Sequence, residues 1–303
     1  MNMYDLVIVG TGPAGLSATI YAARYKMNIV TIGKLHGGTV TEAHLVENYP
    51  GVGEISGMEL GQKMLEQAKS LGAEVIADSI QKIEKQDKFF VLHTQSGKYE
   101  TRRILLAMGA ERTKLKTKGE EEFLGKGVAY CATCDGPFFK GKTVSVVGGG
   151  NAAVTSAIYM SDIAEKVYLI YRGPELKAEP AWIEQLEKKN NIEIVYNANI
   201  DEISGENLVE QIKLDDGKEL KVDGVFVEIG STPSKALIND LGLKTDPRGY
   251  VIVDAEMKTS TQGVWAAGDI TAGEFKFRQV VTATAEGALA IYSAYLDTKK
   301  EKG

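Results

Sequence analysis

Cysteine and histidine are scarce in this 303-residue sequence, which has two cysteines and three histidines. A structural zinc site needs four ligands, commonly two cysteine pairs or one pair with histidines. Both cysteines lie in one Cys-Ala-Thr-Cys segment, Cys131–Cys134, and the histidines lie far upstream, so we expect no metal site. A disulfide across two intervening residues closes too small a loop to stabilise the fold much. Redox chemistry is therefore the expected role of the pair.

The sequence also lacks any run of 18 or more apolar residues, and Met1-Asn2-Met3 leads directly into an apolar strand-like segment. We therefore expect no membrane-spanning helix and no signal peptide, which predicts a cytoplasmic protein. In that compartment a lone Cys-x-x-Cys pair is more often catalytic than structural. The net charge of −6 lacks the basic excess that nucleic-acid binding calls for, so we expect no nucleic-acid partner.

Glycine, in contrast, is abundant: of 33 glycines, several form two turns that each follow an apolar strand and open a helical pattern. In dinucleotide-binding turns the first glycine permits the tight turn and the second lets the pyrophosphate approach the backbone. The third position stays small so that helix and strand can pack, and the helix N-terminus faces the phosphates. Two such units predict two dinucleotide sites. Their residues are Gly10, Gly12, Pro13, Ala14 and Gly15 in the first turn and Gly148, Gly150, Asn151 and Ala153 in the second.

The residues after the second strand of each unit bear on which nucleotide binds. The usual acidic ribose partner, about 20 residues after the turn, is missing from the first unit, where Ile32-Gly33-Lys34 stands. In the second unit Tyr171-Arg172-Gly173 follows the strand and Lys177 comes shortly after. Arg172 and Lys177 are suited to a 2′-phosphate, which favours NADPH over NADH. The alternative interpretation is that both are solvated surface cations.

Further motifs complete a resemblance to a known family. They are Gly37-Gly38, Glu47-Asn48-Tyr49-Pro50-Gly51, the segment Tyr130–Asp135, Ala266-Ala267-Gly268-Asp269 and Arg278-Gln279. With both glycine turns they make the chain resemble the low-molecular-weight thioredoxin reductases over essentially its full length. The resemblance implies a flavoprotein that takes electrons from NADPH into FAD and passes them to the Cys131/Cys134 dithiol. The dithiol then reduces thioredoxin or a thioredoxin-like protein, and a homodimer is expected.

The resemblance also implies roles for single residues. Asp269, after Gly268, is expected to bind the ribityl chain of FAD, which suits a carboxylate as a hydroxyl acceptor. The segment around Asn48 is expected to line the isoalloxazine ring, with Arg278 and Gln279 near the ring edge. Asp135 is the expected proton donor to the leaving thiolate. Gly38 and Gly109 are further expected cofactor-binding positions.

The sequence departs from the family pattern at the second nucleotide site. Typical members have His-Arg-Arg where Tyr171-Arg172-Gly173 stands, and an arginine in place of Lys177. Lysine binds a phosphate only as a point charge, whereas arginine can bind it through two hydrogen bonds at once. Other donors, NADH or reduced ferredoxin, therefore stay open. A dithiol oxidase, a reductase of peroxiredoxin-like partners and a flavin redox sensor that does not turn over are further alternatives.

The expected fold class is α/β, with two Rossmann-like dinucleotide-binding domains, the second inserted in the first. Because Gly268-Asp269 completes the site that Gly10 opens, the FAD domain is predicted to be discontinuous and to comprise residues 1–113 and 244–303. Residues 114–243 form the predicted pyridine-nucleotide domain, which carries the cysteine pair. Segments 89–94 and 211–214 are predicted to be strands of antiparallel hairpins.

Overall fold

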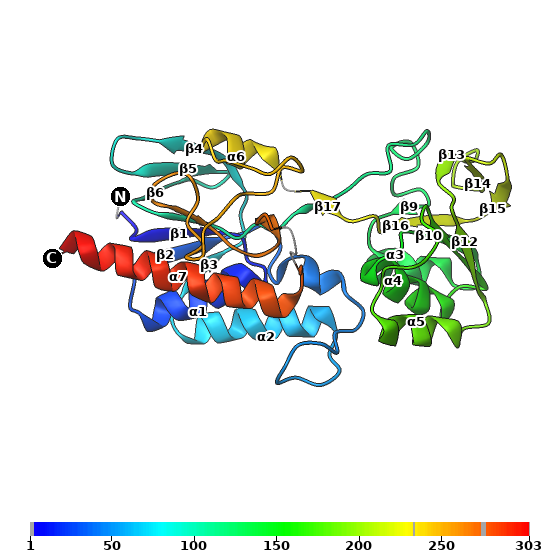
Figure 1. Cartoon of the computed structure of the whole chain (residues 1–303), viewed down its shortest axis with the longest axis horizontal. Coiled ribbons are helices and arrows are strands. Elements are labelled where there is room, and N and C mark those ends of the chain that lie inside the picture. The colour runs from blue at the N-terminus through cyan, green and yellow to red at the C-terminus, as the bar shows by residue number, and fades with distance from the viewer. Residues whose placement is uncertain (1–2, 233, 274–276, 303) are drawn as a thin grey trace. The chain divides into compact units, whose positions relative to one another are not determined.

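The computed structural model describes residues 3–232, 234–273 and 277–302. The chain forms two compact units (Figure 1). Unit 1 comprises Met1–Thr41, Val46–Glu111 and Thr232–Gly303, and unit 2 comprises Glu42–Leu45 and Arg112–Ser231. Two short strands, β8 (Glu111–Arg112) and β17 (Ser231–Thr232), pair where the chain passes from one unit to the other.

Unit 1 is built on a five-stranded parallel sheet in the order β18-β7-β1-β2-β3. Its central strand alternates between two cores, as the twofold repeat of a strand requires: Leu6 and Ile8 face one core, and Val7 and Val9 face the other. The strands are β1 (Leu6–Val9), β2 (Ile29–Ile32), β3 (Glu74–Ile76), β7 (Ile104–Leu106) and β18 (Val264–Ala266).

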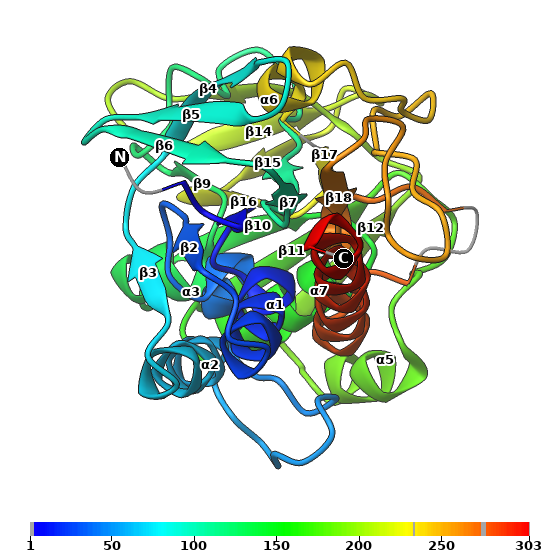
Figure 2. The ribbon, with the colours of Figure 1, turned by 90° about the vertical axis from the view of Figure 1, so that its left-hand side faces the viewer.

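Different layers cover the two faces of this sheet (Figure 2). One face carries the helices α1 (Pro13–Arg24), α2 (Gly57–Ser70) and α7 (Val280–Lys302). The other carries the antiparallel strands β4 (Ile80–Lys85), β5 (Phe90–Thr94) and β6 (Lys98–Thr101), together with α6 (Lys235–Asp240). The short helices η1 (Gly38–Glu42) and η3 (Gly268–Ile270) follow β2 and β18.

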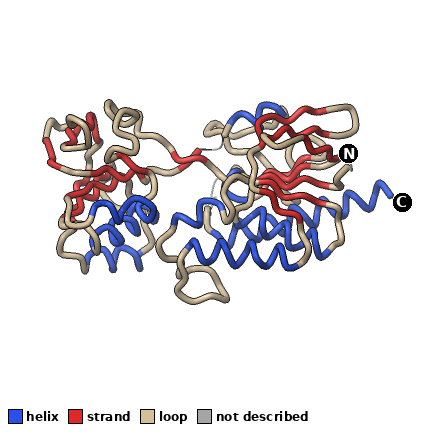
Figure 3. The backbone as a smooth tube through the Cα atoms, turned by 180° about the vertical axis from the view of Figure 1, so that it is seen from behind, coloured by secondary structure: helices blue, strands red, loops and turns tan. Residues whose placement is uncertain are grey.

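Unit 2 repeats this plan with a parallel sheet in the order β12-β11-β10-β16-β9. In unit 2 the helices gather on one side of the parallel strands, as α1, α2 and α7 do in unit 1 (Figure 3). The sheet consists of β9 (Val128–Ala129), β10 (Thr143–Val147), β11 (Lys166–Tyr171), β12 (Ile192–Tyr196) and β16 (Gly224–Val227). The helices are α3 (Ala132–Asp135), η2 (Gly136–Phe139), α4 (Asn151–Ser161) and α5 (Pro180–Glu187), and the antiparallel strands are β13 (Ile200–Ser204), β14 (Gln211–Leu214) and β15 (Glu219–Lys221).

The predicted α/β class with two Rossmann-like units is confirmed, as are the hairpin strands β5 and β14. The compact units have other bounds than the predicted domains: unit 2 includes Glu42–Leu45 and starts at Arg112 and not at residue 114, and unit 1 resumes at Thr232 and not at residue 244. The reason for the last of these differences is α6, whose Leu237 and Ile238 pack into the core of unit 1. The backbone N–H of Ile83 also donates to the carboxylate of Asp240 at 2.9 Å. Which cofactor each unit binds stays a prediction.

Candidate active site

The two cysteines form a disulfide at the start of α3, with their Cα atoms 5.3 Å apart. Cys131 is the N-cap of this helix, and its sulfur accepts the backbone N–H of Cys134 at 3.2 Å. Cys134 is exposed, whereas Cys131 and the neighbouring Asp135 are half-buried. The pair is therefore accessible on one side, and a backbone donor already points at the sulfur of Cys131.

A short segment, Glu42–Leu45, belongs to unit 2 although it lies far from α3 in the sequence; we call it the strap. Leu45 packs against the core around α4, and the ring of His44 lies 4.4 Å from that of Tyr159. The hydroxyl of Thr133, inside the Cys-x-x-Cys motif, donates to the backbone carbonyl of Glu42. The same hydroxyl oxygen lies 3.5 Å from the sulfur of Cys131. The strap is thus tied to the residue between the two cysteines.

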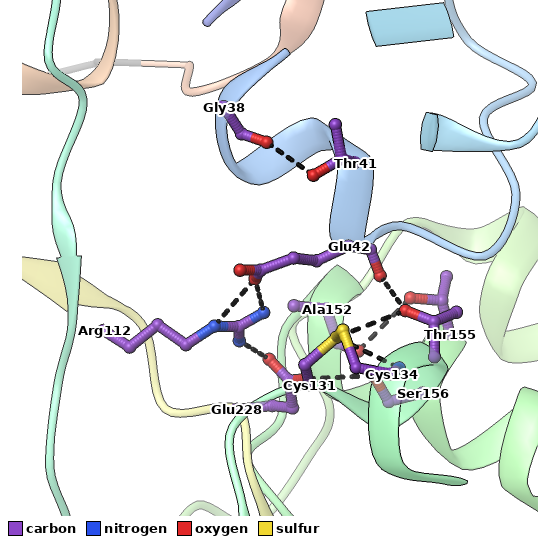
Figure 4. Close-up of polar contacts among 11 residues, drawn as sticks. Gly38, Thr41, Glu42, Arg112, Cys131, Cys134, Ala152, Thr155, Ser156 and Glu228 are labelled. Atoms are coloured by element: carbon purple, nitrogen blue, oxygen red, sulfur yellow. Dashed lines mark hydrogen bonds and ion pairs between the residues drawn. A yellow bond between two sulfur atoms is a disulfide. The ribbon is translucent and has the colours of Figure 1, made fainter. Parts of the chain in front are cut away.

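An ion cluster lies in the same region (Figure 4). The guanidinium of Arg112 pairs with the carboxylates of Glu42 and Glu228, and Ser156 donates to Glu228 at 3.2 Å. Only 4% of the Glu228 side chain is exposed. Burial raises the pKa of Glu228 although the charge of Arg112 and the hydrogen bonds act in the opposite direction. A buried carboxylate needs such partners, since an unpaired charge in the interior is costly.

A cleft of about 580 Å³ opens beside the disulfide within unit 2. This volume is within the range of ligand-binding sites, roughly 300–1,000 Å³. Both cysteines and Asp135 contribute to its wall, and the rest is lined by Glu42, Arg112, Lys114, Leu124, Gly125, Val128, Ala129 and Tyr130. The disulfide therefore faces a concave surface that combines apolar and charged groups.

Tyr130, directly before the cysteine pair, is held by the buried carboxylate of Glu120. Its hydroxyl donates to Glu120 at 2.7 Å, and the same carboxylate accepts the backbone N–H groups of Leu115 and Lys116. Burial, together with this carboxylate, raises the pKa of Tyr130. Because Glu120 is only 1% exposed, it fixes both the loop that enters unit 2 and the residue preceding Cys131.

The first glycine turn depends on close backbone contacts. A Cβ on Gly10 would lie 2.2 Å from the carbonyl oxygen of Ala107, and one on Gly15 would lie 1.9 Å from that of Gly10. A Cβ on Gly38 would lie 2.7 Å from the Cα of Gly12. The helix α1 starts with Pro13 at its first turn, and no side chain caps it. Its N-terminal N–H groups therefore face a cradle walled by glycine backbone.

Unit 1 brings distant predicted residues to this turn. A Cβ on Gly268 would lie 2.9 Å from the Cβ of Ala14, which puts the Gly268-Asp269 motif beside α1. The side-chain amide of Asn48 donates to Gln279 at 3.0 Å. Arg278 donates to the backbone carbonyl of Asp269 at 3.2 Å. All of these predicted positions thus converge in unit 1, where Gly109, with a φ of 65°, follows β7.

The second glycine turn is covered by an aromatic ring. A Cβ on Gly149 would lie 2.5 Å from the ring of Tyr171, and one on Gly173 would lie 2.7 Å from it. The amide of Asn151 exchanges two hydrogen bonds of 2.8 Å with Glu179, one to its carboxylate and one from its backbone N–H. These contacts fix the start of α4, whereas the space around Gly150 is open.

The two predicted cations of this turn lie at its edge. Arg172 and Lys177 are both exposed, and the structure shows no ion pair for either one with the described residues. The backbone N–H of Lys177 donates to the carbonyl of Gly149 at 2.7 Å. The loop that carries both cations is thereby fastened to the glycine turn.

Within the described residues, no group of three or more His, Cys, Asp or Glu side chains is arranged to hold a metal ion. No helix in residues 3–232, 234–273 and 277–302 is long and apolar enough to cross a membrane.

Comparison with known proteins identifies the family. A model of the pyridine nucleotide-disulphide oxidoreductases matches residues 4–287. The chain belongs to this family. Among its relatives, the thioredoxin reductase of Treponema pallidum is 42% identical over 97% of this chain and 98% of its own. The structure of T. acidophilum thioredoxin reductase is 37% identical, with a TM-score of 0.93 over 99% of this chain and 100% of that one. A ferredoxin-flavin thioredoxin reductase from Clostridium acetobutylicum is 34% identical, with a TM-score of 0.54 over 98% of this chain and 99% of the other.

This oxidoreductase therefore has the thioredoxin reductase fold, and the resemblance seen in its sequence is confirmed. The family implies FAD and a pyridine nucleotide as cofactors. The first turn fits such a group, because a Cβ at Gly38 would fill the cradle beside Gly12 and α1 offers uncapped N–H groups. The roles of the individual site residues stay predictions.

Several residues of the oxidoreductase's site were missed by the sequence analysis. Two of them left a signal in the sequence that could have revealed them. Thr133 lies within the cysteine motif, and Glu228 is a carboxylate directly after an apolar strand. Glu42 and Arg112 carried no such signal, because their ion pair joins residues 70 positions apart. Glu120 was also missed, since nothing local in the sequence distinguishes a buried glutamate from its exposed neighbours Glu121 and Glu122.

Proposed function

We propose that this oxidoreductase reduces the disulfide of thioredoxin or a thioredoxin-like protein through its Cys131/Cys134 pair. The observation that carries the proposal is the disulfide on the surface of unit 2, with the N–H of Cys134 directed at the sulfur of Cys131. A thiolate is the nucleophile of disulfide exchange, and a donor at a helix start favours it. Cys131 is therefore the proposed attacking thiol.

The exchange follows the usual course of dithiol chemistry. The thiolate of Cys131 attacks one sulfur of the partner's disulfide and forms a mixed disulfide. Cys134 then attacks the sulfur of Cys131, which releases the partner as a dithiol and restores the disulfide of this chain. Asp135 lines the same cleft as both cysteines, and its proposed role is to donate the proton that a departing thiolate takes up.

FAD, when bound, supplies the electron pair that reduces the Cys131–Cys134 disulfide. The residues proposed to hold it are those that converge in unit 1. The glycine turn with α1 would receive the pyrophosphate, and Asp269 would accept hydrogen bonds from the hydroxyl groups of the ribityl chain. Asn48 and Gln279, which are hydrogen-bonded to each other, are proposed to position the ring.

The surface beside the disulfide supports a protein partner. Phe138, four residues after Cys134, is 78% exposed, although it is a large apolar side chain. Exposed aromatic side chains commonly anchor protein interfaces. We propose that the partner's disulfide loop packs against Phe138 while its sulfur reaches Cys131.

The proposed electron donor is NADPH, bound at the second glycine turn. Its support is the pair of exposed cations, Arg172 and Lys177, on a loop fastened to Gly149. One observation favours a second candidate: the ring of Tyr171 packs against Gly149, next to Gly150, whose backbone the pyrophosphate would approach. A reduced ferredoxin-like protein is that candidate, and a relative named for ferredoxin has the same fold.

A homodimer is also proposed. Leu289, Tyr292 and Leu296 of α7 are 41–50% exposed and recur at spacings of three and four, and the ring of Tyr292 lies 6.4 Å from that of Tyr25 in α1. Such a stripe of large apolar side chains is suited to an interface with a second copy. A monomeric mass in light scattering would contradict this.

The function is tested by the Cys131→Ser and Cys134→Ser variants of the flavin-loaded enzyme. Each is expected to lose reduction of a thioredoxin disulfide down to background, because the chain has no other thiol to replace the missing one. Each is also expected to keep its flavin, measured by absorbance, since the proposed FAD residues are in unit 1. Unchanged thioredoxin reduction by either variant would refute the relay, and protein that releases no flavin on denaturation would refute the cofactor.

A further inference from the structure

The hydroxyl of Thr133 has one hydrogen and two acceptors within reach. It donates to the backbone carbonyl of Glu42, in the strap. Its oxygen also lies 3.5 Å from the sulfur of Cys131. A hydroxyl carries a single donor, so it can serve only one of these two acceptors at a time.

Which acceptor receives this hydrogen depends on the state of the sulfur. In the disulfide, the sulfur of Cys131 is a weak acceptor and the carbonyl of Glu42 is a strong one. The hydroxyl of Thr133 accordingly donates to the carbonyl of Glu42 in the structure, where the cysteines are disulfide-bonded. Reduction breaks the S–S bond with two electrons and one proton: Cys134 takes up the proton, and Cys131 becomes a thiolate. A charged acceptor attracts a donor about twice as strongly as a neutral one. Because the sulfur and the hydroxyl oxygen are already in contact, the hydrogen needs only to rotate.

We infer that Thr133 is a positioning residue that switches its hydrogen bond with the redox state. In the oxidised protein it fastens the strap to α3, and in the reduced protein it stabilises the thiolate of Cys131 and releases the carbonyl of Glu42. The side chain of Glu42 stays paired with Arg112 in both states. The release is therefore local to the backbone of the strap.

The inference rests on the redox role proposed for the cysteine pair, but its first test needs no turnover. In a Cys134→Ser background the only thiol is Cys131, and its apparent pKa follows from the pH dependence of alkylation by iodoacetamide. Adding Thr133→Val is expected to raise this pKa by about one unit or more, because a hydrogen bond to a charged group is lost. Thr133→Ser is expected to restore it, since serine keeps the hydroxyl.

The charged neighbours of the cleft, Glu42, Arg112, Lys114 and Asp135, are the same in all these variants, so their effect on the pKa cancels in the comparison. An equal pKa in the valine and serine variants would overturn the inference. If the pKa shifts as expected while the unmodified enzyme fails to reduce thioredoxin, the proposed function fails and the inference stands.

The second test follows the strap by hydrogen exchange in the flavin-loaded enzyme. Dithiothreitol reduces the disulfide and is itself oxidised to its cyclic disulfide, with one proton left on Cys134 and one released. Amides in residues 43–45 are expected to exchange faster after reduction. In the Thr133→Val variant the same amides are expected to exchange at the faster rate in both the oxidised and the reduced protein. Exchange that reduction leaves unchanged in the unmodified enzyme would contradict the switch.

Discussion

The two glycine turns share the same backbone geometry but differ in the groups that pack around them. In unit 1 the first glycine, Gly10, has a φ of 116° and a Cβ there would lie 2.2 Å from the carbonyl of Ala107. In unit 2 the corresponding Gly148 has a φ of 142°, and a Cβ would lie 2.3 Å from the carbonyl of Glu228. Ala107 and Glu228 each directly follow a strand that neighbours the strand before the turn, β7 or β16. The geometry that requires glycine is thus the same in both.

The differences lie around this shared geometry. The third position is Gly15 in unit 1 and Ala153 in unit 2, and the residue after the neighbouring strand is an alanine in one and a buried glutamate in the other. Glycine backbone walls the first turn, whereas the ring of Tyr171 covers Gly149 in the second. One scaffold therefore serves a cradle walled by glycine backbone in unit 1 and a turn joined to a charge cluster in unit 2.

The largest expected effect comes from exchanging the third positions. In Gly15→Ala the new Cβ would lie 1.9 Å from the carbonyl oxygen of Gly10. Backbone atoms cannot move aside as the end of a flexible side chain can. We therefore expect the free energy of unfolding to fall by ~3 kcal/mol and the protein to lose its flavin. The reciprocal control, Ala153→Gly, is expected to cost only about 1 kcal/mol. Urea unfolding and flavin content measure both, and a Gly15→Ala protein as stable and as yellow as the original would contradict the argument.

A smaller effect is expected at the edge of the second turn. If NADPH is the donor, Arg172→Ala should raise its KM with little effect on NADH, because only NADPH carries the 2′-phosphate. Loss of a charge-assisted contact costs about 1.5–3 kcal/mol, or roughly 10- to 150-fold. Lys188→Ala, which removes an exposed cation of unit 2 elsewhere, is the matched control. Stopped-flow mixing in which neither nucleotide reduces the flavin at millimolar concentration would reject the assignment in favour of a protein donor.

The smallest expected effect is the pH dependence that Glu228 adds to unit 2, where unit 1 has Ala107 at the corresponding position. Because burial raises its pKa in the folded state, the folded protein binds this proton more tightly than the unfolded chain does. Its contribution to the free energy of unfolding is therefore complete below the ordinary pKa, about 4.3, and is lost as pH rises through the raised value. Glu228→Gln removes this dependence.

Thermal unfolding of both proteins from acidic to neutral pH measures the effect. The Tm of the original protein should fall relative to that of Glu228→Gln as pH rises, by on the order of a few degrees, since about 1 kcal/mol shifts Tm by ~2–4 °C in domains of this size. Parallel Tm curves would show that Glu228 titrates alike in the folded and unfolded states.

Sequence patterns predicted what depends on local spacing. Each glycine turn lies between a strand and a helix, because this arrangement involves residues within a few positions of one another. The meeting of Gly268 with the first turn was predicted by resemblance, not by spacing. The ion cluster was not predicted, since Arg112 and Glu228 are 116 positions apart and an ion pair leaves no periodic trace in either segment. The assignment of the strap to unit 2 was missed for the same reason.

The two tryptophans provide an optical consequence of the two-unit fold. Trp265 lies in β18 of unit 1, where its indole N–H donates to Ser293 at 3.0 Å, and Trp182 lies in α5 of unit 2. Both are buried, with 2% and 8% of their surface exposed, and the sequence contains no others. Replacing either one with phenylalanine leaves a single fluorophore that reports on one unit. A pair of such proteins reports the unfolding of each unit separately, whereas the ellipticity of the whole chain reports both together.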